Sequence, residues 1–260
     1  MYGINKFICI AGKNQCAIDT LKYVLKKFKN KYKVLALPNE SDNGKDGWQK
    51  SFKKFCKKKN IEITKVENLY KIDKLYFFSL EYEKILNVKK FTSKRLFNFH
   101  FSMLPKYRGC HTNFYQIFYG EKKSGVTLHV IDNGIDTGNI IDKSNFKIQL
   151  NDTAYDNYLK LLNCSINLFK KNIYKILKNK YKLIKQNSKK GTYFSKKSVN
   201  YKKLIKISKL KHNLTTHNKL RSLIFPPFQL PIYDGKKITK SIFKNNKIKL
   251  EFKLWLIELL

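Results

Sequence analysis

Arginine is scarce in a chain that is otherwise strongly basic. The 260 residues carry a formal net charge of +37, yet only three of the 55 basic residues are arginine, namely Arg95, Arg108 and Arg221. Arginine is the side chain best suited to bidentate contacts with phosphates and bases, so a dedicated nucleic-acid reader should contain more of it. The lysine excess therefore favours a solvated basic surface, and we expect no nucleic-acid partner. Its somewhat stronger concentration in residues 151–260 also suits an anionic substrate.

Metal sites and disulfides lack their usual sequence patterns. The cysteines are odd in number, show no CxxC spacing and have no histidine cluster near them; they are Cys9, Cys16, Cys56, Cys110 and Cys164. A disulfide framework needs paired cysteines, and a zinc site needs closely spaced ligands. The sequence therefore predicts neither, and we expect no metal.

Long apolar runs are missing as well. No window reaches the roughly 18 consecutive apolar residues of a transmembrane helix, and the first apolar run, residues 4–11, is too short for a signal peptide. The chain is nevertheless 42% hydrophobic and 14% aromatic, enough for a substantial core. We therefore expect a cytoplasmic protein without membrane insertion.

The first third of the chain alternates between strand and helix patterns. Apolar strand-like runs and segments of helical spacing follow one another at residues 4–11, 15–29, 34–37, 48–59, 61–64 and 74–80. Such alternation predicts an α/β fold, a Rossmann-like, mostly parallel sheet with helices on both faces. Only Gly12 marks the first turn, where a dinucleotide fingerprint requires GxGxxG, so a nicotinamide cofactor is not supported.

The remainder predicts an end to the catalytic domain near residue 180. Strands are expected at 95–101, 125–131 and 139–148, a helix at 112–119, and a long amphipathic helix from Asn151 to Leu177. Lysine-rich, polar sequence then indicates a linker. We therefore expect a catalytic domain at 1–180, a linker at 181–200 and a small C-terminal β-rich subdomain at 201–260, with strands at 236–243 and 247–254.

Reactive side chains concentrate between residues 98 and 138. Asn98 and His100 alternate with phenylalanines along a predicted strand, so they share one face. A neutral His100 can accept a proton, Asp136 can fix its tautomer, and the Asn98 amide can donate to an oxyanion. This set suits acyl transfer to an amine, because the substrate itself supplies the nucleophile. The alternative is that His100 is simply a structural histidine of the strand.

Two motifs in this stretch resemble the folate-dependent formyltransferases. They are NFHFSMLPKYRG, residues 98–109, and GVTLHVIDNGIDTG, residues 125–138. The resemblance implies a Rossmann-like domain that uses 10-formyltetrahydrofolate as formyl donor, with a catalytic set at Asn98, His100 and Asp136. The residues that it implies for folate binding are Phe78, Leu80, Glu81, Met103, Leu104, Asp132 and Gly134.

Other segments are similar to one branch of this family, the sugar-nucleotide N-formyltransferases. They are 11–14, 48–52, 78–81, 193–197 and 218–231. The resemblance implies formylation of a dTDP-linked amino-deoxysugar, expected to be dTDP-4-amino-4,6-dideoxyglucose, in lipopolysaccharide O-antigen biosynthesis, by a homodimer. The residues expected to bind this substrate are Arg108, Tyr193, Lys196, Asn218, Arg221, Phe225 and Gln229.

Alternatives remain for the branch and for the nucleotide site. A methionyl-tRNA formyltransferase would use the positive charge, but that branch carries a larger C-terminal RNA-binding barrel than residues 201–260 allow; glycinamide ribonucleotide formyltransferases lack such a tail. Arg221 and the aromatic residues after it suit a pyrophosphate and a thymine, or they form the small core of the subdomain. His111, Thr112 and Asn113 depart from the pattern of the sugar branch.

Overall fold

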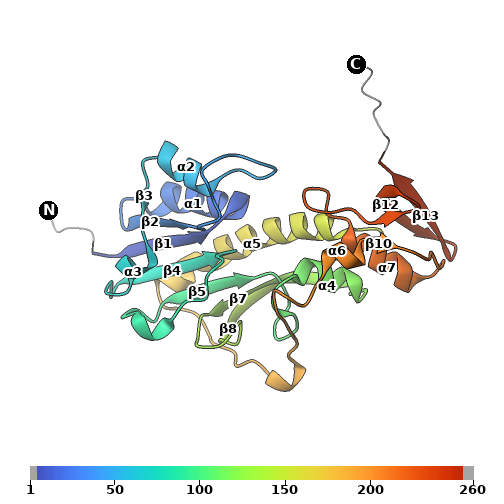
Figure 1. Cartoon of the computed structure of the whole chain (residues 1–260). Helices are drawn as coiled ribbons and strands as arrows, with labels where there is room; N and C mark the ends of the chain where they lie inside the picture. Colours follow the sequence, from blue (N-terminus) through green and yellow to red (C-terminus); the bar gives the residue numbers. More distant parts are fainter. Residues whose placement is uncertain (1–4, 254–260) are drawn as a thin grey trace, which may run out of the picture. The chain divides into compact units, whose positions relative to one another are not determined.

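The chain forms two compact units that interleave along the sequence. The computed structural model describes residues 5–253 (Figure 1). One unit comprises Met1–Arg108, Gly125–Asn145 and Leu162–Thr192, and the other Gly109–Ser124, Phe146–Leu161 and Tyr193–Leu260. The sequence predicts contiguous domains at residues 1–180 and 201–260 with a linker at 181–200, and that division stays a prediction.

A seven-stranded sheet forms the framework of the first unit, in the order β3-β2-β1-β4-β5-β7-β8. Its strands are β1 (Phe7–Gly12), β2 (Lys33–Pro38), β3 (Glu62–Ile63), β4 (Leu75–Leu80), β5 (Leu96–His100), β7 (Lys123–Val130) and β8 (Ile140–Lys147). The pairs from β3 to β5 are parallel, whereas β5 and β7 are antiparallel. The predicted mostly parallel α/β sheet is confirmed. Ile4, included in the first predicted strand, lies outside the described residues.

Helices cover both faces of this sheet because its central strand is apolar on both sides. Every residue of β4, LYFFSL, is buried, as expected where a strand is covered on both faces. Phe78 and Phe99 contact Phe169 of α5 (Ala154–Leu177), which also packs on Tyr23 of α1 (Asn14–Phe28). Phe77, the neighbour of Phe78, belongs to a separate core cluster with Leu69 of α3 (Val66–Leu69) and with Phe91.

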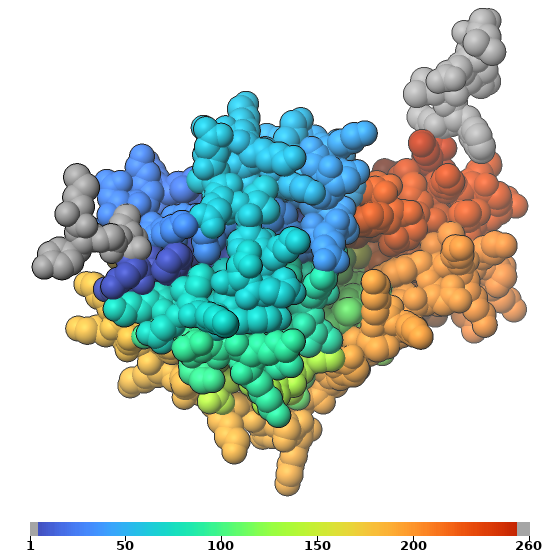
Figure 2. All heavy atoms as spheres, turned by 60° about the vertical axis from the view of Figure 1, so that its left-hand side comes forward, coloured from blue at the N-terminus to red at the C-terminus, as the bar shows by residue number. Residues whose placement is uncertain are grey.

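The prediction of a helix from residue 48 was wrong at its first turn. Helix α2 spans Phe52–Lys58. It begins at Phe52 because the Ser51 side chain caps it by accepting from the Lys54 backbone N–H. The Ser51 hydroxyl also donates to Asp42, at 2.6 Å, which ties the preceding loop to the cap. Trp48 is therefore outside the helix and 43% exposed, and its loop lies on the surface (light blue in Figure 2).

The second unit holds a small, mostly antiparallel sheet and two helices that the sequence did not predict. Its four-stranded sheet comprises β10 (Lys206–Ile207), β11 (Ile232–Tyr233), β12 (Lys236–Lys244) and β13 (Lys247–Phe252). The helices are α4 (Thr112–Phe118) and the two that were not predicted, α6 (Tyr201–Leu204) and α7 (Leu214–Leu223). Leu220 of α7 packs on Ile238 and Ile248, which makes a separate core. The predicted C-terminal β-rich part is thus confirmed; Leu254, the end of its last predicted strand, lies outside the described residues.

Short elements complete the chain. They are the two-residue strands β6 (Arg108–Gly109) and β9 (Tyr193–Phe194), which pair with each other, and the 3₁₀ turns η1 (Val88–Lys90) and η2 (Ser188–Lys190). Between residues 5 and 253, no helix combines the length and the apolarity needed to cross a bilayer.

Gly12 provides a test of the sheet, because β1 and β4 approach each other there without room for a side chain. An alanine Cβ at Gly12 would lie 1.9 Å from the Leu80 carbonyl oxygen, and the backbone has φ +149°. We expect Gly12→Ala to lower the free energy of unfolding by about 1–3 kcal/mol, the usual cost of overpacking, as measured by urea unfolding. Gly47→Ala is the matched control, since nothing lies within 4 Å of its Cβ. Equal stability of the two variants would contradict this packing.

Candidate active site

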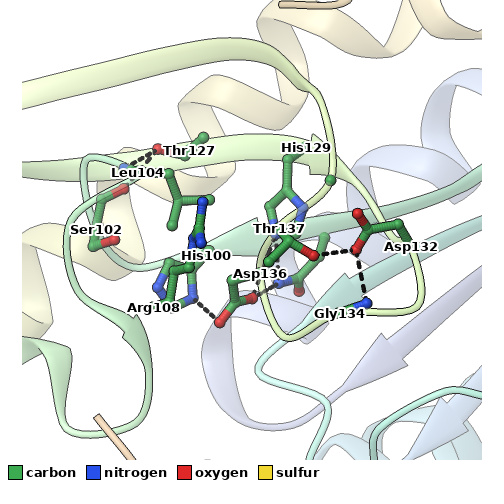
Figure 3. Close-up of polar contacts among 12 residues, drawn as sticks. His100, Ser102, Leu104, Arg108, Thr127, His129, Asp132, Gly134, Asp136 and Thr137 are labelled. Atoms are coloured by element: carbon green, nitrogen blue, oxygen red, sulfur yellow. Dashed lines mark hydrogen bonds and ion pairs between the residues drawn. The ribbon is translucent and has the colours of Figure 1, made fainter. Parts of the chain in front are cut away.

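The catalytic face of β5 is defined by its alternation of polar and aromatic residues. Phe97 stacks on Phe78 and Phe99 contacts Phe169 in the core. Asn98 and His100 point the other way, and both reach Asp136. Figure 3 shows His100 beside Asp136, which lies in the loop between β7 and β8. The structure therefore brings together the three residues expected to be catalytic.

Asp136 is the centre of this cluster. Its Oδ1 accepts a hydrogen bond from Asn98 Nδ2 at 3.2 Å, and its Oδ2 lies 3.4 Å from His100 Nδ1. His129 Nε2 lies 3.5 Å from Oδ1. The Asp136 side chain is only 11% exposed, so one largely buried carboxylate faces three polar side chains.

A backbone carbonyl sets the tautomer of His100. The sequence had suggested Asp136 for this role. His100 Nε2 lies 2.7 Å from the carbonyl oxygen of Tyr107. A carbonyl can only accept, so Nε2 carries the proton of the neutral ring and Nδ1 carries the lone pair. The position that can receive a second proton is therefore the one beside the Asp136 carboxylate.

Burial keeps His100 neutral near pH 7. The pKa of His100 is lowered, chiefly because the buried imidazolium would lose hydration. The Asp136 charge and the Tyr107 carbonyl raise this pKa and offset part of the effect, whereas His129 and Arg108 lower it further. A neutral imidazole whose protonated form is stabilised by a carboxylate is suited to general base catalysis.

His129 belongs to the cluster, although the sequence identified it only as part of a motif. It lies opposite Asn98 in the antiparallel register of β5 and β7, and its Nε2 is 3.1 Å from Asn98 Nδ2. His129 Nδ1 lies 2.9 Å from the Val130 carbonyl, so the proton of the neutral ring sits on Nδ1 and Nε2 accepts from Asn98. Its position depends on an antiparallel pair within a mostly parallel sheet, which the sequence pattern did not predict.

The loop after β5 is held in place by two threonines. Thr127 Oγ1 accepts from the Leu104 N–H at 3.1 Å and donates to the Ser102 carbonyl at 2.7 Å (Figure 3). The Tyr107 N–H donates to Thr192 Oγ1, at 2.7 Å. These contacts fix the turn whose carbonyl meets His100, so the histidine is oriented by a supported backbone.

The loop that carries Asp136 is stabilised by its own side chains and by Gln186. Asp132 Oδ1 accepts from the Gly134 N–H at 3.1 Å and from the Thr137 hydroxyl at 2.6 Å. Gln186 Nε2 donates to the carbonyls of Asp136, at 2.9 Å, and Gly138, at 2.8 Å. Nothing in the sequence pointed to Gln186, because it lies in the segment interpreted as a linker.

The residues expected to bind folate occupy two kinds of position. Phe78, Leu80 and Leu104 are fully buried, so their side chains belong to the core. The residues with exposed surface are Glu81, directly after β4, Met103 in the loop after β5, and Asp132 and Gly134 in the Asp136 loop. Because β4 and β5 are adjacent and parallel, Glu81 and Met103 follow the carboxyl ends of neighbouring strands, where open α/β sheets bind ligands.

Of the residues expected to bind the sugar nucleotide, Arg108 alone belongs to the first unit. Its Nη2 donates to Gln186 Oε1 at 2.8 Å, and its Nε donates to the same oxygen at 3.3 Å. Arg108 as a whole is partly exposed, so part of the residue remains accessible.

Arg221, in contrast, is engaged in the structure of the second unit. It is 3% exposed, and its guanidinium donates to the Asp152 carbonyl at 2.8 Å and to Asn218 Oδ1 at 2.9 Å. Burial lowers the pKa of Arg221 to about 10, against the opposing effect of the Asp152 charge, so it remains a cation at neutral pH. This geometry favours a structural role for Arg221 and Asn218 over pyrophosphate binding.

The other residues expected at the substrate site also lie in the second unit. Phe225 is buried against Tyr155 and Tyr158, and it stacks on the exposed ring of Phe228. The Phe225 N–H donates to the Gln229 carbonyl, at 3.0 Å. Tyr193 and Lys196 are exposed. The ring nitrogen Nε2 of His111, a departure from the sugar-branch pattern, lies 2.9 Å from the Lys196 carbonyl.

The cluster has the chemistry of acyl transfer. The Asn98 amide can stabilise an oxyanion, the His100 imidazole can accept a proton, and the Asp136 carboxylate can stabilise the resulting imidazolium. Across the described part of the chain, no group of three or more histidine, cysteine or acidic side chains is arranged to hold a metal ion.

Comparison with known proteins identifies the relatives of this chain. The formyl transferase family model matches residues 49–172. The bifunctional polymyxin resistance protein ArnA of Wigglesworthia glossinidia brevipalpis is 36% identical over 142 residues, 54% of this chain and 22% of that protein. A methionyl-tRNA formyltransferase of Clostridium tetani is 29% identical over 64% of this chain and 57% of that protein. The match thus spans less than two thirds of either relative.

Two solved structures match almost the whole chain. WlaRD, a sugar 3N-formyl transferase solved in the presence of dTDP and 5-N-formyl-THF, is 44% identical, with a TM-score of 0.87 over 94% of this chain and 88% of that one. An N-formyltransferase from Helicobacter canadensis, solved with folinic acid and dTDP-3-aminofucose, is 43% identical, with a TM-score of 0.85 over 91% and 87%. This chain therefore belongs to the sugar N-formyltransferases of the formyl transferase family.

Proposed function

We propose that the protein transfers the formyl group of 10-formyltetrahydrofolate to the amino group of a dTDP-linked amino-deoxysugar. The observation that carries the proposal is the buried cluster in which Asp136 joins Asn98 to His100. Membership of the sugar N-formyltransferases supports the substrate class, since the two relatives at 43% and 44% identity were solved with dTDP or a dTDP-sugar and a formylated folate.

The neutral amine is the nucleophile of the proposed reaction. Its lone pair attacks the formyl carbon, and the carbonyl oxygen becomes an oxyanion held by the Asn98 amide. The amine proton passes to Nδ1 of His100, where the Asp136 carboxylate stabilises the imidazolium. The bond between the formyl carbon and N10 of the folate then breaks, N10 takes the proton from His100, and tetrahydrofolate leaves.

Asn98 must exchange one of its present contacts to act as the oxyanion donor. Its amide nitrogen lies 3.2 Å from Asp136 Oδ1 and 3.1 Å from His129 Nε2, and these contacts engage both amide hydrogens. Hydrogen bonds of catalytic groups commonly rearrange when substrate binds. A donor released from His129 would turn toward the oxyanion while the contact with Asp136 holds the amide in place.

The position of the amine on the sugar is the finer part of the proposal. WlaRD is a 3N-formyl transferase, and the relative from Helicobacter canadensis was solved with dTDP-3-aminofucose. We therefore place a dTDP-linked 3-amino sugar ahead of dTDP-4-amino-4,6-dideoxyglucose, which stays a prediction of the sequence resemblance. The homodimer, the cytoplasmic location and the role in O-antigen synthesis also stay predictions.

A substrate comparison tests this proposal directly. We expect purified protein with 10-formyltetrahydrofolate to release tetrahydrofolate when a dTDP-3-amino sugar is added, with a higher kcat/KM than for a dTDP-4-amino sugar. Methionyl-tRNA is the third acceptor in the assay, since methionyl-tRNA formyltransferases match part of the chain. Turnover confined to the tRNA would overturn the proposed function. A higher kcat/KM for the 4-amino sugar would favour dTDP-4-amino-4,6-dideoxyglucose, the substrate that the sequence resemblance predicts.

Removing the proposed oxyanion donor should reduce turnover while substrate binding is largely retained. We expect Asn98→Ala to lower kcat by roughly 10²- to 10³-fold, the usual effect of losing one such donor, in steady-state assays. Lys94→Ala is the control, because Lys94 is exposed just before the same strand. A kcat near that of the wild type in Asn98→Ala would exclude Asn98 from the mechanism.

The pH profile should report the charge of Asp136. His100 must be neutral to accept a proton, so kcat/KM should fall as the pH drops through its pKa, which lies below the ordinary value of 6.5. Asp136 raises this pKa, so in Asp136→Asn the acid limb should move to lower pH while kcat falls by roughly 10²-fold or more. Circular dichroism checks the fold, and an acid limb at the wild-type position would contradict the assignment.

A further inference from the structure

The segment after α5 returns to the edge of the sheet next to the catalytic loop. Ile184 forms an isolated antiparallel bridge with Ile140, the first residue of β8. The two residues exchange two backbone hydrogen bonds of 2.8 Å. Gln186 follows two residues later and is partly buried. The bridge therefore fixes the backbone from which the Gln186 side chain reaches the Asp136 loop.

The Gln186 amide uses both of its ends. Its nitrogen donates to the carbonyls of Asp136 and Gly138, at 2.9 and 2.8 Å. Its oxygen accepts from Arg108 Nη2 and Nε, at 2.8 and 3.3 Å. Two donors and two accepted hydrogen bonds exhaust the capacity of a carboxamide, so no other side chain of similar size can reproduce the arrangement.

We propose that Gln186 is a positioning residue for formyl transfer, which fixes the backbone that presents Asp136 to His100 and orients the Arg108 guanidinium at the same time. The inference rests on the proposed function, because it assigns Gln186 to that reaction. Gln186 acts through these two residues and does not itself need to touch either substrate.

The conformation of Asp136 explains why such a clamp is required. Its φ of 55° lies in the left-handed region, which non-glycine residues adopt only where the surroundings hold them. Gln186 binds the carbonyl of Asp136 itself and that of Gly138 two residues later, so it restrains the turn on both sides of Thr137. Without this restraint the carboxylate can drift from Asn98 and His100, and displacements of about 1 Å are known to cost roughly 10²-fold in rate.

Gln186→Met tests the clamp with a side chain of similar length and no hydrogen-bonding amide. We expect kcat to fall roughly 10- to 10²-fold. The imidazole titration of His100, followed by NMR and assigned with a His100→Asn variant, should move to lower pH. Asp136, His129 and Arg108 are the charged or titratable groups that act on His100, and the effect of Asp136 is the largest of the three. When the Asp136 carboxylate drifts away, part of its effect on His100 is lost, so the pKa of His100 should fall.

Gln186→Glu separates the two halves of the amide. A carboxylate still accepts from Arg108, but it has no hydrogen to donate to the Asp136 and Gly138 carbonyls. We expect this variant to lose kcat as Gln186→Met does, because the donors hold the catalytic loop. Lys185→Met is the matched control, since Lys185 is the exposed neighbour on the same segment and should retain wild-type kcat and His100 titration.

Three outcomes would overturn the inference. They are wild-type kcat in both Gln186 variants, an unchanged His100 titration in Gln186→Met, and an equal loss of activity in Lys185→Met. If Gln186→Met fails to fold by circular dichroism, the kcat of Gln186→Glu decides, because the added carboxylate would itself act on the His100 titration. If the wild-type protein formylates no amino sugar, the proposed function fails, whereas the NMR titration still decides whether Gln186 positions Asp136 beside His100.

Discussion

One buried carboxylate, that of Asp136, is the constraint on which the site depends. A buried charge is costly unless polar partners compensate for it, and here Asn98, His100 and His129 surround it. Each partner in turn has a second contact that sets its orientation, such as the Tyr107 carbonyl on His100. The cluster is therefore cooperative, because displacement of one group leaves another without its partner.

The sheet provides this cluster through its register. Asn98 lies opposite His129, and His100 lies opposite Thr127, across the antiparallel pair of β5 and β7. Since side chains alternate along a strand, a slip of one residue would turn the polar face into the core. The phenylalanines on the opposite face of β5 oppose such a slip because they are packed against Phe78 and Phe169. Hydrophobic packing on one face thereby fixes the chemistry on the other.

The three arginines contrast with the many lysines. Arg95 lies over the Tyr76 ring, with its guanidinium carbon 5.1 Å from the ring centroid, Arg108 binds Gln186, and Arg221 is buried against the Asp152 carbonyl. Each therefore occupies a position that uses the planar guanidinium. The scarcity of arginine argues against a nucleic-acid reader, and that stays a prediction. It did not indicate that Arg221 would be buried, since a linear motif does not reveal burial.

The sequence by itself determined the parallel α/β frame, the shared face of Asn98 and His100, and the family, because periodicity and motif spacing are local properties. Only the tertiary structure decided which partners these residues meet. His129 required the antiparallel register, the Tyr107 carbonyl required a turn held by two distant threonines, and Gln186 required a segment that returns to the sheet after α5. Helix α7 was not predicted, and the late start of α2 has a local cause, the Ser51 cap, which the apolar spacing from Trp48 does not reveal. The partners of the catalytic residues depend instead on contacts between residues far apart in the chain, and such contacts leave no periodic signal in one sequence.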